Sequence, residues 1–243
     1  MQTDPLAAKS YRWRRHLARA FGVKLTGDIP ERLIGMGLPV PLNAKRRRRL
    51  AAIRAGEVLF IHVPKNAGTS LSMALYGQPI RHDTIRYYHA VAPELTASAM
   101  TVAVIRDPVE RFVSAFRFAQ SGGTHRQVSA PFRSAYAGFA TIDDALDHIE
   151  RHRDPFAVDH IFRAQSWYLI DRFGQLAVRH LVPIDGLPQL RALLPANRGA
   201  VIPKLNQSRA APVPVSDAQR ARIESLYPDD VALWSQTRAS AAA

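Results

Sequence analysis

Two stretches of the chain share one pattern, in which a short apolar run leads into a tight loop and then into apolar positions at helical spacing. Residues 58–63 are apolar apart from His62, and residues 101–105 form the second run. Short apolar runs rich in β-branched residues are typical of buried parallel strands. After the second run, Asp107 is suited to cap a helix and Pro108 to occupy its first position. The pattern predicts two units of strand, loop and helix.

Other segments extend this alternation. Helices are predicted over residues 141–152 and 157–173, and a third strand within residues 177–183. A last helix is predicted to begin at Ser216 and Asp217 and to run to about Trp234. Strands that alternate with helices predict an α/β sandwich around a mainly parallel sheet. We expect this domain to span residues 55–243, after a basic helical arm over residues 1–54.

The basic residues concentrate in that arm. The chain has a net charge of +13, and residues 1–54 hold 13 of its 33 Lys and Arg residues but only three of its 20 Asp and Glu residues. An apolar residue recurs there every four positions, which is typical of a cationic amphipathic helix: Trp13, Leu17, Phe21 and Leu25. The arm either packs on the domain with a solvated basic face, contacts an anionic membrane surface or other polyanion, or binds nucleic acid. No specific nucleic acid is expected, because no reading module is recognisable.

Composition narrows the class of protein. The chain has no cysteine, which excludes disulfides, thiolate metal sites and a cysteine nucleophile. No window approaches the ~18 consecutive apolar residues of a membrane span, and the first thirty residues lack a secretory signal pattern. We therefore expect a cytoplasmic protein, with peripheral contact at the inner membrane surface through the arm as the alternative.

The loop over residues 64–70 is the strongest candidate for a binding site. A loop between a buried strand and a helix N-terminus directs backbone amides and the positive end of the helix dipole towards a bound anion. Gly68 permits close approach, Thr69 and Ser70 add hydroxyl donors, and Lys65 adds a positive charge. The spacing is not that of a Walker A loop, because the lysine precedes the glycine. The alternative is a plain turn with an exposed lysine.

A second candidate anion site follows the second strand. Arg106 ends that strand and would lie at the same carboxyl edge of the sheet as the loop, with Ser114 two turns into the next helix. Ligands bind at this edge of parallel sheets. Arg106 could instead pair with Asp107 or Glu110, and Ser114 could lie on a solvated helix face. Together they predict a second phosphate site at a fixed distance from the first.

These two motifs resemble those of the sulfotransferases. Residues 61–70, IHVPKNAGTS, resemble the 5′-phosphosulfate loop of that family, and residues 104–114, VIRDPVERFVS, resemble its 3′-phosphate motif. The likeness is greatest to the carbohydrate-type branch, which includes the heparan 2-O- and chondroitin sulfotransferases and bacterial relatives. It spans about residues 56–236, with weaker matches at 159–165, 181–187, 204–208 and 226–230. The resemblance implies a P-loop-like three-layer sandwich.

The resemblance also implies an activity. A sulfuryl group would pass from 3′-phosphoadenosine 5′-phosphosulfate to a hydroxyl or amine, with a saccharide or glycolipid as the expected acceptor and no metal. The residues implied to hold the 5′-phosphosulfate are Lys65, Asn66, Ala67, Gly68, Thr69 and Ser70. Arg106 and Ser114 would hold the 3′-phosphate.

The general base is expected to be a histidine. His89 resembles the position of the catalytic histidine in the heparan 2-O-type enzymes, and an imidazole titrates near working pH. His82 is the second candidate, with the carboxylates of Asp83 and Glu94 nearby in sequence, and His89 could equally be a core or rim residue. His62 is expected to pack in the core or to support the loop. His160 is not expected to be a metal ligand.

Two other functions stay open at this point. A phosphoryl-transfer enzyme could use the same strand, loop and helix with ATP, and would require magnesium. A non-catalytic module could bind a polyanion or membrane through the basic arm. Ligand-dependent stability distinguishes these hypotheses, because a ligand of the native state raises the melting temperature.

Overall fold

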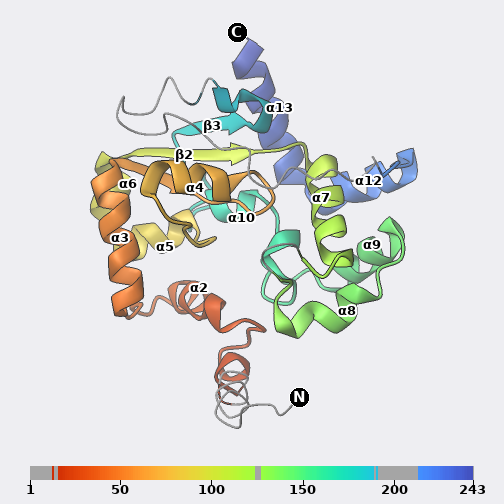
Figure 1. The fold of residues 1–243 in the computed structure, drawn as a ribbon, viewed down its shortest axis with the longest axis horizontal. Helices are drawn as coiled ribbons and strands as arrows, with labels where there is room; N and C mark the ends of the chain where they lie inside the picture. Colours follow the sequence, from red (N-terminus) through yellow and green to blue (C-terminus); the bar gives the residue numbers. More distant parts are fainter. Residues whose placement is uncertain (1–12, 14–15, 124–126, 189, 191–212, 243) are drawn as a thin grey trace.

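Three strands form a parallel sheet at the centre of the protein (Figure 1). The computed structural model describes residues 13, 16–123, 127–188, 190 and 213–242. The sheet order is β1 (Val58–Ile61), β2 (Met100–Ile105) and β3 (His180–Pro183). Val58 pairs with Met100, and Val102 with His180. The predicted α/β class and parallel sheet are confirmed: β1 and β3 lie inside the predicted apolar runs, and β2 begins one residue before its run, at Met100.

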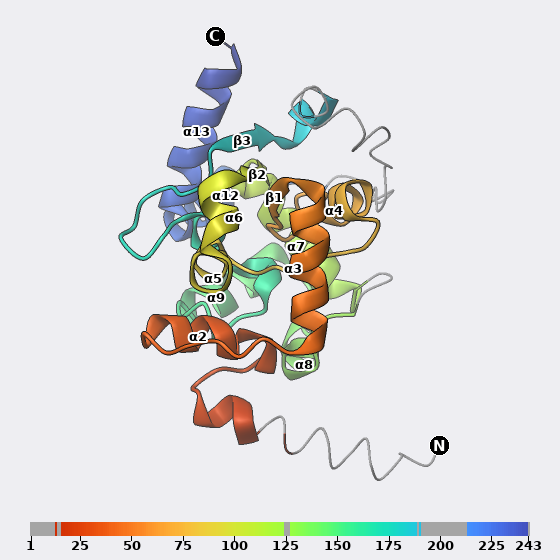
Figure 2. The same ribbon diagram turned by 90° about the vertical axis from the view of Figure 1, so that its left-hand side faces the viewer.

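Helices cover both sides of this sheet. In Figure 2, α4 (Gly68–Tyr76) lies on one side, and α6 (Pro93–Ser98) and α13 (Pro228–Ala242) lie on the other. The helices α3 (Ala44–Gly56) and α5 (Ile85–Val91) contribute side chains to the same hydrophobic core. The hydroxyl of Tyr76 donates to the carbonyl of Val58 and accepts from the amide of Phe60, which ties α4 to β1.

A second hydrophobic core lies among helices beyond the carboxyl end of β2. Its helices are α7 (Pro108–Gln120), α8 (Arg133–Ala137), α9 (Ile142–Arg151) and α12 (Asp217–Leu226), with the 3-10 turn η2 (Ala130–Phe132). The side chains of Asp107, Thr141 and Ser216 accept amide hydrogen bonds as N-caps of α7, α9 and α12. These caps explain why the three helix starts were predictable from sequence.

The segment 157–173 is not the single helix that its periodicity predicts. It contains the 3-10 turn η3 (His160–Phe162) and the one-turn α10 (Ser166–Leu169), separated by extended backbone at Arg163. One distant carboxylate explains the break, because the amides of Gln165 and Ser166 both donate to Asp230, at 2.7 and 2.8 Å. A further 3-10 turn, η4 (Ile184–Gly186), follows β3.

The predicted last helix is two helices. The first, α12, ends at Leu226, and α13 begins at Pro228 and continues to Ala242, beyond the expected end at Trp234. Proline lacks an amide hydrogen and clashes with the preceding turn, so it begins a new helix rather than extending the old one.

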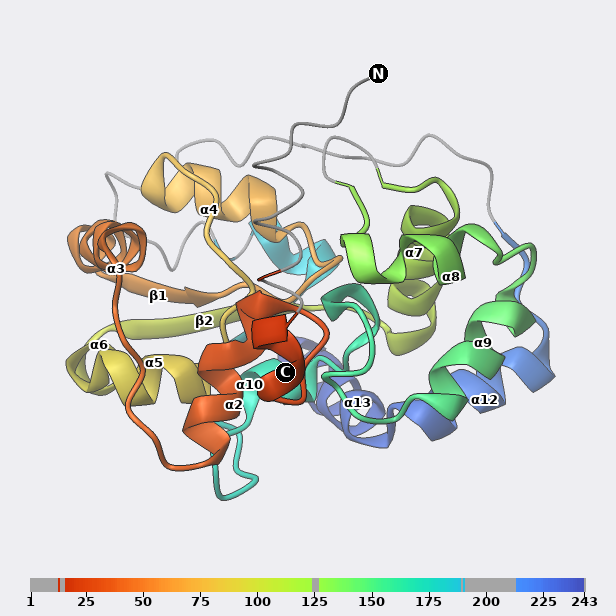
Figure 3. The ribbon, with the colours of Figure 1, turned by 90° about the horizontal axis from the view of Figure 1, so that it is seen from below.

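The described part of the arm packs against the domain. Residues 16–20 are helical, but the chain turns at Gly22 with a φ of 62°, so Leu25 is not on the helix that the four-residue spacing predicts. The turn η1 (Thr26–Asp28) and the helix α2 (Ile29–Gly35) follow, and α2 contacts α5, as Figure 3 shows from below. The division at residue 54 stays a prediction.

Two buried acids join the arm to the domain. Asp28 forms an ion pair with both terminal nitrogens of Arg163, and the two residues are 8% and 3% exposed. Glu31 accepts from the amide and the hydroxyl of Thr84, at 3.1 and 2.9 Å. Burial raises the pKa of Glu31 to about 7, although these hydrogen bonds and Arg86 oppose the shift.

No helix in the described residues is both long and apolar enough to cross a bilayer.

Candidate active site

The loop after β1 ends in a strained turn at the N-terminus of α4. Lys65 and Ala67 have φ values of 70° and 57°, in the left-handed region that few non-glycine residues adopt. The amides of Ser70 and Leu71 donate back to the carbonyl of Ala67, at 3.1 and 3.3 Å. The amides that precede them belong to the helix end, where backbone donors have no intrahelical partner. The loop therefore has the backbone of an anion-binding site.

Gly68 is required here by packing as well as by access. A Cβ on Gly68 would collide with the imidazole of His62, which is buried beneath the start of α4. Any larger residue would displace either the ring or the first turn of α4. His62 thus supports the loop, in agreement with its assignment from sequence.

Lys65 is a cation in an electropositive and partly buried position. Its ammonium nitrogen lies 4.4 Å from the ring centroid of Phe118 on α7. Burial, together with the positive charges of Arg106 and Arg111, lowers the pKa of Lys65 to about 8. The positive charge of Arg106, in the second motif, therefore repels the charge of Lys65, in the first motif. A bound anion would relieve this repulsion.

Gln165 links the two motifs directly. Its side-chain oxygen accepts from the side chain of Asn66 at 2.7 Å and from the amide of Arg106 at 3.0 Å. Its side-chain nitrogen donates to the carbonyl of Arg106 at 2.8 Å. Asn66 also donates to the carbonyl of Val104 at 2.8 Å. The end of β2 and the loop after β1 are therefore fixed relative to each other.

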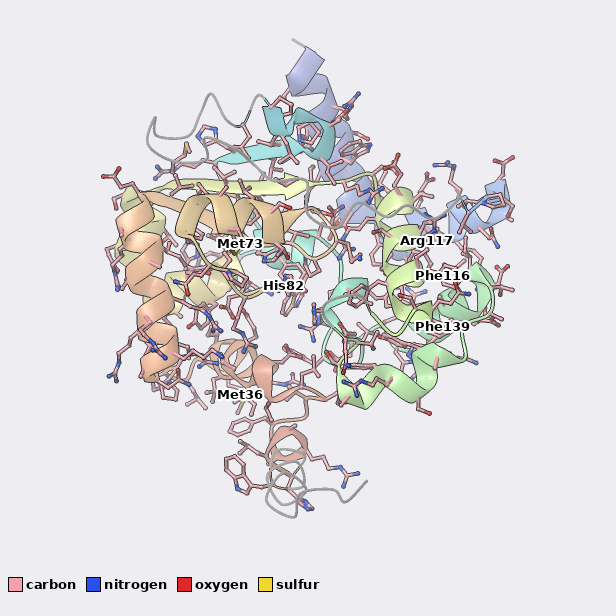
Figure 4. All side chains as sticks on the ribbon, viewed as in Figure 1. Met36, Met73, His82, Phe116, Arg117 and Phe139 are labelled. Atoms are coloured by element: carbon pink, nitrogen blue, oxygen red, sulfur yellow. The ribbon has the colours of Figure 1, made fainter. Side chains whose placement is uncertain are left out.

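Arg106 lies beside a pocket at the first turns of α7. Its Nε donates to Glu110 at 3.1 Å, which was the alternative considered from sequence. The pocket has a volume of about 440 Å³ and is lined by Arg106, Asp107, Val109, Glu110, Val113, Arg117, Val213, Val215 and Arg220. Figure 4 labels Arg117 on α7. Three arginines on the lining make the pocket suitable for an anionic group.

Ser114 lies between this pocket and the lysine. It is half-buried on α7, one turn after Glu110 and one turn before Phe118. Because residues four apart are neighbours on a helix surface, Ser114 bridges the pocket face and the face that contacts Lys65. The two motifs thus meet along α7.

Comparison with known proteins agrees with these motifs. A family model described as the sulfotransferase family matches residues 54–187, more than half of the chain. The chain belongs to the sulfotransferase family. A search of curated proteins and a search of solved structures found no match. The weaker sequence likeness at residues 204–208 lies outside the described residues of this sulfotransferase.

A row of three imidazoles adjoins the loop of the sulfotransferase. The ring centroids of His62 and His82 are 4.1 Å apart, and those of His82 and His160 are 4.7 Å apart. The Nδ1 of His82 lies 2.9 Å from the carbonyl oxygen of His62. His82 is half-buried, and Figure 4 labels it below α4 in that view. The second base candidate from sequence therefore lies beside the loop.

Asp159 anchors the outer end of this row. Its carboxylate lies 2.9 Å from Nδ1 of His160 and accepts from the amides of Ser129 and Ile161. Burial acts to raise the pKa of Asp159, but His160 and these donors together hold it well below its usual range. In the described part of the sulfotransferase, no group of three or more His, Asp or Glu side chains is arranged to hold a metal ion.

The sulfotransferase does not bring His89 to this row. His89 is exposed in the last turn of α5. The helix that carries His89 leads through α6 to the amino end of β2, whereas the loop follows the carboxyl end of β1. The two nearby carboxylates also have other partners, since Asp83 pairs with Arg81 and Glu94 with Arg54.

Sequence reasoning missed the residues that brace the site. Arg111 is buried on α7 and donates to the carbonyls of Pro64 at 3.2 Å and Arg163 at 2.7 Å. It therefore joins the loop of the sulfotransferase to the segment that carries Gln165. The only signal was its place inside the second motif, between apolar positions of a helix.

Proposed function

We propose that this sulfotransferase transfers a sulfuryl group from 3′-phosphoadenosine 5′-phosphosulfate to a hydroxyl or amine of a saccharide or glycolipid. The observation that carries the proposal is the link through Gln165, which holds the Lys65 loop and Arg106 at one edge of the sheet. Two cationic sites at a fixed separation suit a donor with a charged group at each end. Family likeness supports the acceptor class.

The donor would lie across α7. The amides of residues 66–70 and the ammonium of Lys65 would bind the 5′-phosphosulfate, and Arg106 and Ser114 the 3′-phosphate. The bound donor supplies a sulfuryl group already activated by its anhydride with phosphate. Lys65 would stabilise the charge that develops on the phosphate oxygen as the bond from sulfur to that oxygen breaks. Fixed positioning supplies the rest of the rate enhancement.

His82 is the proposed general base. The contact of its Nδ1 with the carbonyl of His62 assigns the proton to Nδ1, so the lone pair is on Nε2. Nε2 would take the proton of the acceptor as the new bond to sulfur forms. His160, oriented by Asp159, stacks on His82 and would restrict the ring.

Donor binding tests this function against the two alternatives. Adenosine 3′,5′-bisphosphate at 100 times its Kd should stabilise the protein by about 2.7 kcal/mol without magnesium. For a chain of this size, that stabilisation corresponds to a melting temperature higher by about 5–10 °C. ATP with magnesium should have little effect. Stabilisation by ATP and magnesium alone would favour phosphoryl transfer, and no response to either would favour a non-catalytic module.

Arg106 should determine affinity for the 3′-phosphate. We expect Arg106→Ala to weaken binding of adenosine 3′,5′-bisphosphate by about 10- to 100-fold, the usual loss for a charged hydrogen bond. Titration calorimetry with AMP provides the control, because AMP lacks the 3′-phosphate and should bind both proteins equally. Equal losses for the two nucleotides would show that Arg106 does not contact the 3′-phosphate.

Glutamine variants of His82 and His89 test which histidine is the general base. His82→Gln should lower kcat by about 10²–10⁴-fold, the usual contribution of general-base catalysis, with little change in donor affinity. His89→Gln should leave kcat unchanged, because His89 is exposed in the last turn of α5 and is not part of the imidazole row beside the loop. Rates with labelled donor and a sulfated-glycan readout would measure both. A loss of kcat in His89→Gln but not in His82→Gln would show that His89 is the general base.

A further inference from the structure

The pocket at the first turns of α7 has one face of that helix as a wall. Val109, Val113 and Arg117 line the pocket at intervals of four residues. Residues four apart lie on the same side of a helix. Val213 and Val215 precede α12 and also line the pocket, and α12 contacts α7. Arg117 is thus a charged side chain among valines, in the last turn of α7.

Arg117 has a donor that nothing in the described protein satisfies. Its Nη2 atom is shielded from solvent and has no hydrogen-bond partner in the described residues. Burying a charged donor without a partner costs free energy, and native proteins rarely leave such a group unpaired. An anion in the pocket would supply the missing partner.

The two acids that line the pocket are engaged at the other end of α7. The carboxylate of Asp107 caps the helix by accepting from the amide of Glu110 at 2.9 Å. The carboxylate of Glu110 accepts from Nε of Arg106 at 3.1 Å. Glu110 precedes Arg117 by seven residues, which is about 10 Å along a helix axis. These acids therefore leave the charge of Arg117 available to a ligand.

Arg117 is a neighbour of Ser114 on the surface of α7. The two residues are three apart in one helix, a spacing that places side chains next to each other. Arg117 nevertheless lies beyond residues 104–114, which carry the likeness to the 3′-phosphate motif. A guanidinium beside a hydroxyl suits a phosphate, because its planar fork can donate two parallel hydrogen bonds to phosphate oxygens. Apolar walls strengthen such bonds by lowering the local dielectric constant.

We propose that Arg117 binds the 3′-phosphate of the donor together with Ser114, as a specificity-determining residue. This inference rests on the proposed function, because it requires a donor that carries a 3′-phosphate. Arg117 contacts the phosphate from the last turn of α7, and Arg106 contacts it from the end of β2. The second arginine favours a 3′-phosphorylated nucleotide over one without that phosphate.

Titration calorimetry with Arg117→Gln tests the inference, because glutamine stays polar but removes the charge. Adenosine 3′,5′-bisphosphate should bind this variant about 10- to 100-fold more weakly, whereas AMP should bind it like the parent. Arg117→Lys should lose less affinity, since it keeps the charge without the fork. The melting temperature of Arg117→Gln without nucleotide should equal or exceed that of the parent, because the variant removes a shielded charge without a partner. A purely structural role would instead lower it.

Arg220→Gln is the matched control. Arg220 lines the same pocket, but it is exposed and lies 3.9 Å from Glu224. This control should weaken bisphosphate binding by about threefold or less, as exposed charges do. If the parent prefers the bisphosphate to AMP but Arg117→Gln keeps that preference, or Arg220→Gln loses as much of it, the inference is overturned and the proposed function stands. If the parent itself shows no preference for the bisphosphate, the proposed donor is wrong and the inference falls with it.

Discussion

Replacing Lys65 with alanine is expected to lower kcat/KM for sulfuryl transfer by about 10²–10³-fold, the usual effect of removing one stabilising donor from a transition state. The ammonium is partly buried among positive charges, with its pKa lowered to about 8, so the protein gains no stability from charging it. The lost contact with Phe118 and the relief of that repulsion should therefore nearly cancel, and unfolding free energy should change by no more than about 1 kcal/mol. Labelled-donor assays and urea denaturation measure the two effects.

A second lysine provides the matched control. Lys24 lies 5.2 Å from the ring of Phe132, a contact like that of Lys65 with Phe118, but outside the loop. Lys24→Ala should leave transfer unchanged. Bisphosphate affinity in the parent should fall as pH rises above about 8, since Lys65 then loses its proton, whereas Lys65→Arg should bind independently of pH in this range. Full activity in Lys65→Ala would show that Lys65 takes no part in sulfuryl transfer.

Asp28→Ala is expected to lower the free energy of unfolding by about 3–5 kcal/mol, the usual result of leaving one partner of a buried ion pair uncompensated. Asp28 belongs to the arm, while Arg163 lies between Asp159 and Gln165 in the domain. The loss would therefore show that the arm contributes to folding stability. Urea denaturation at neutral pH gives the value.

The exposed pair of Asp185 and Arg238 is the control for this prediction. Both side chains are at least half exposed, and such pairs contribute about 0–1 kcal/mol. Asp185→Ala should therefore change stability little. If Asp28→Ala and Asp185→Ala are equally mild, the arm is not coupled to the domain through this ion pair.

The elements closest in sequence to the site were predictable because their signals are local. An apolar β-branched run forms β1, and its continuation through a glycine into helical spacing forms the loop and α4. Asp107 and Pro108 begin α7 as a cap and first residue do in isolated helices. The parallel pairing of β1 with β2 follows from two such units in succession.

The rest depends on contacts between distant residues. Gln165 is 99 positions from Asn66 and 59 from Arg106, and no periodicity marks a residue whose partners belong to two distant motifs. The same holds for Asp230, which ends the regular structure expected over residues 157–173. His82 and His160 meet only because the chain brings both to the loop after β1. His89 lies in the last turn of α5 and is not part of this row of imidazoles, so its role as the base stays a prediction beside that of His82.

A structure of the complex with adenosine 3′,5′-bisphosphate tests the central claim most directly. The account predicts one nucleotide along α7, with its 5′-phosphate at the amides of residues 66–70 and Lys65, and its 3′-phosphate at Arg106 and Ser114. A nucleotide bound elsewhere, or in the reverse direction, would contradict it.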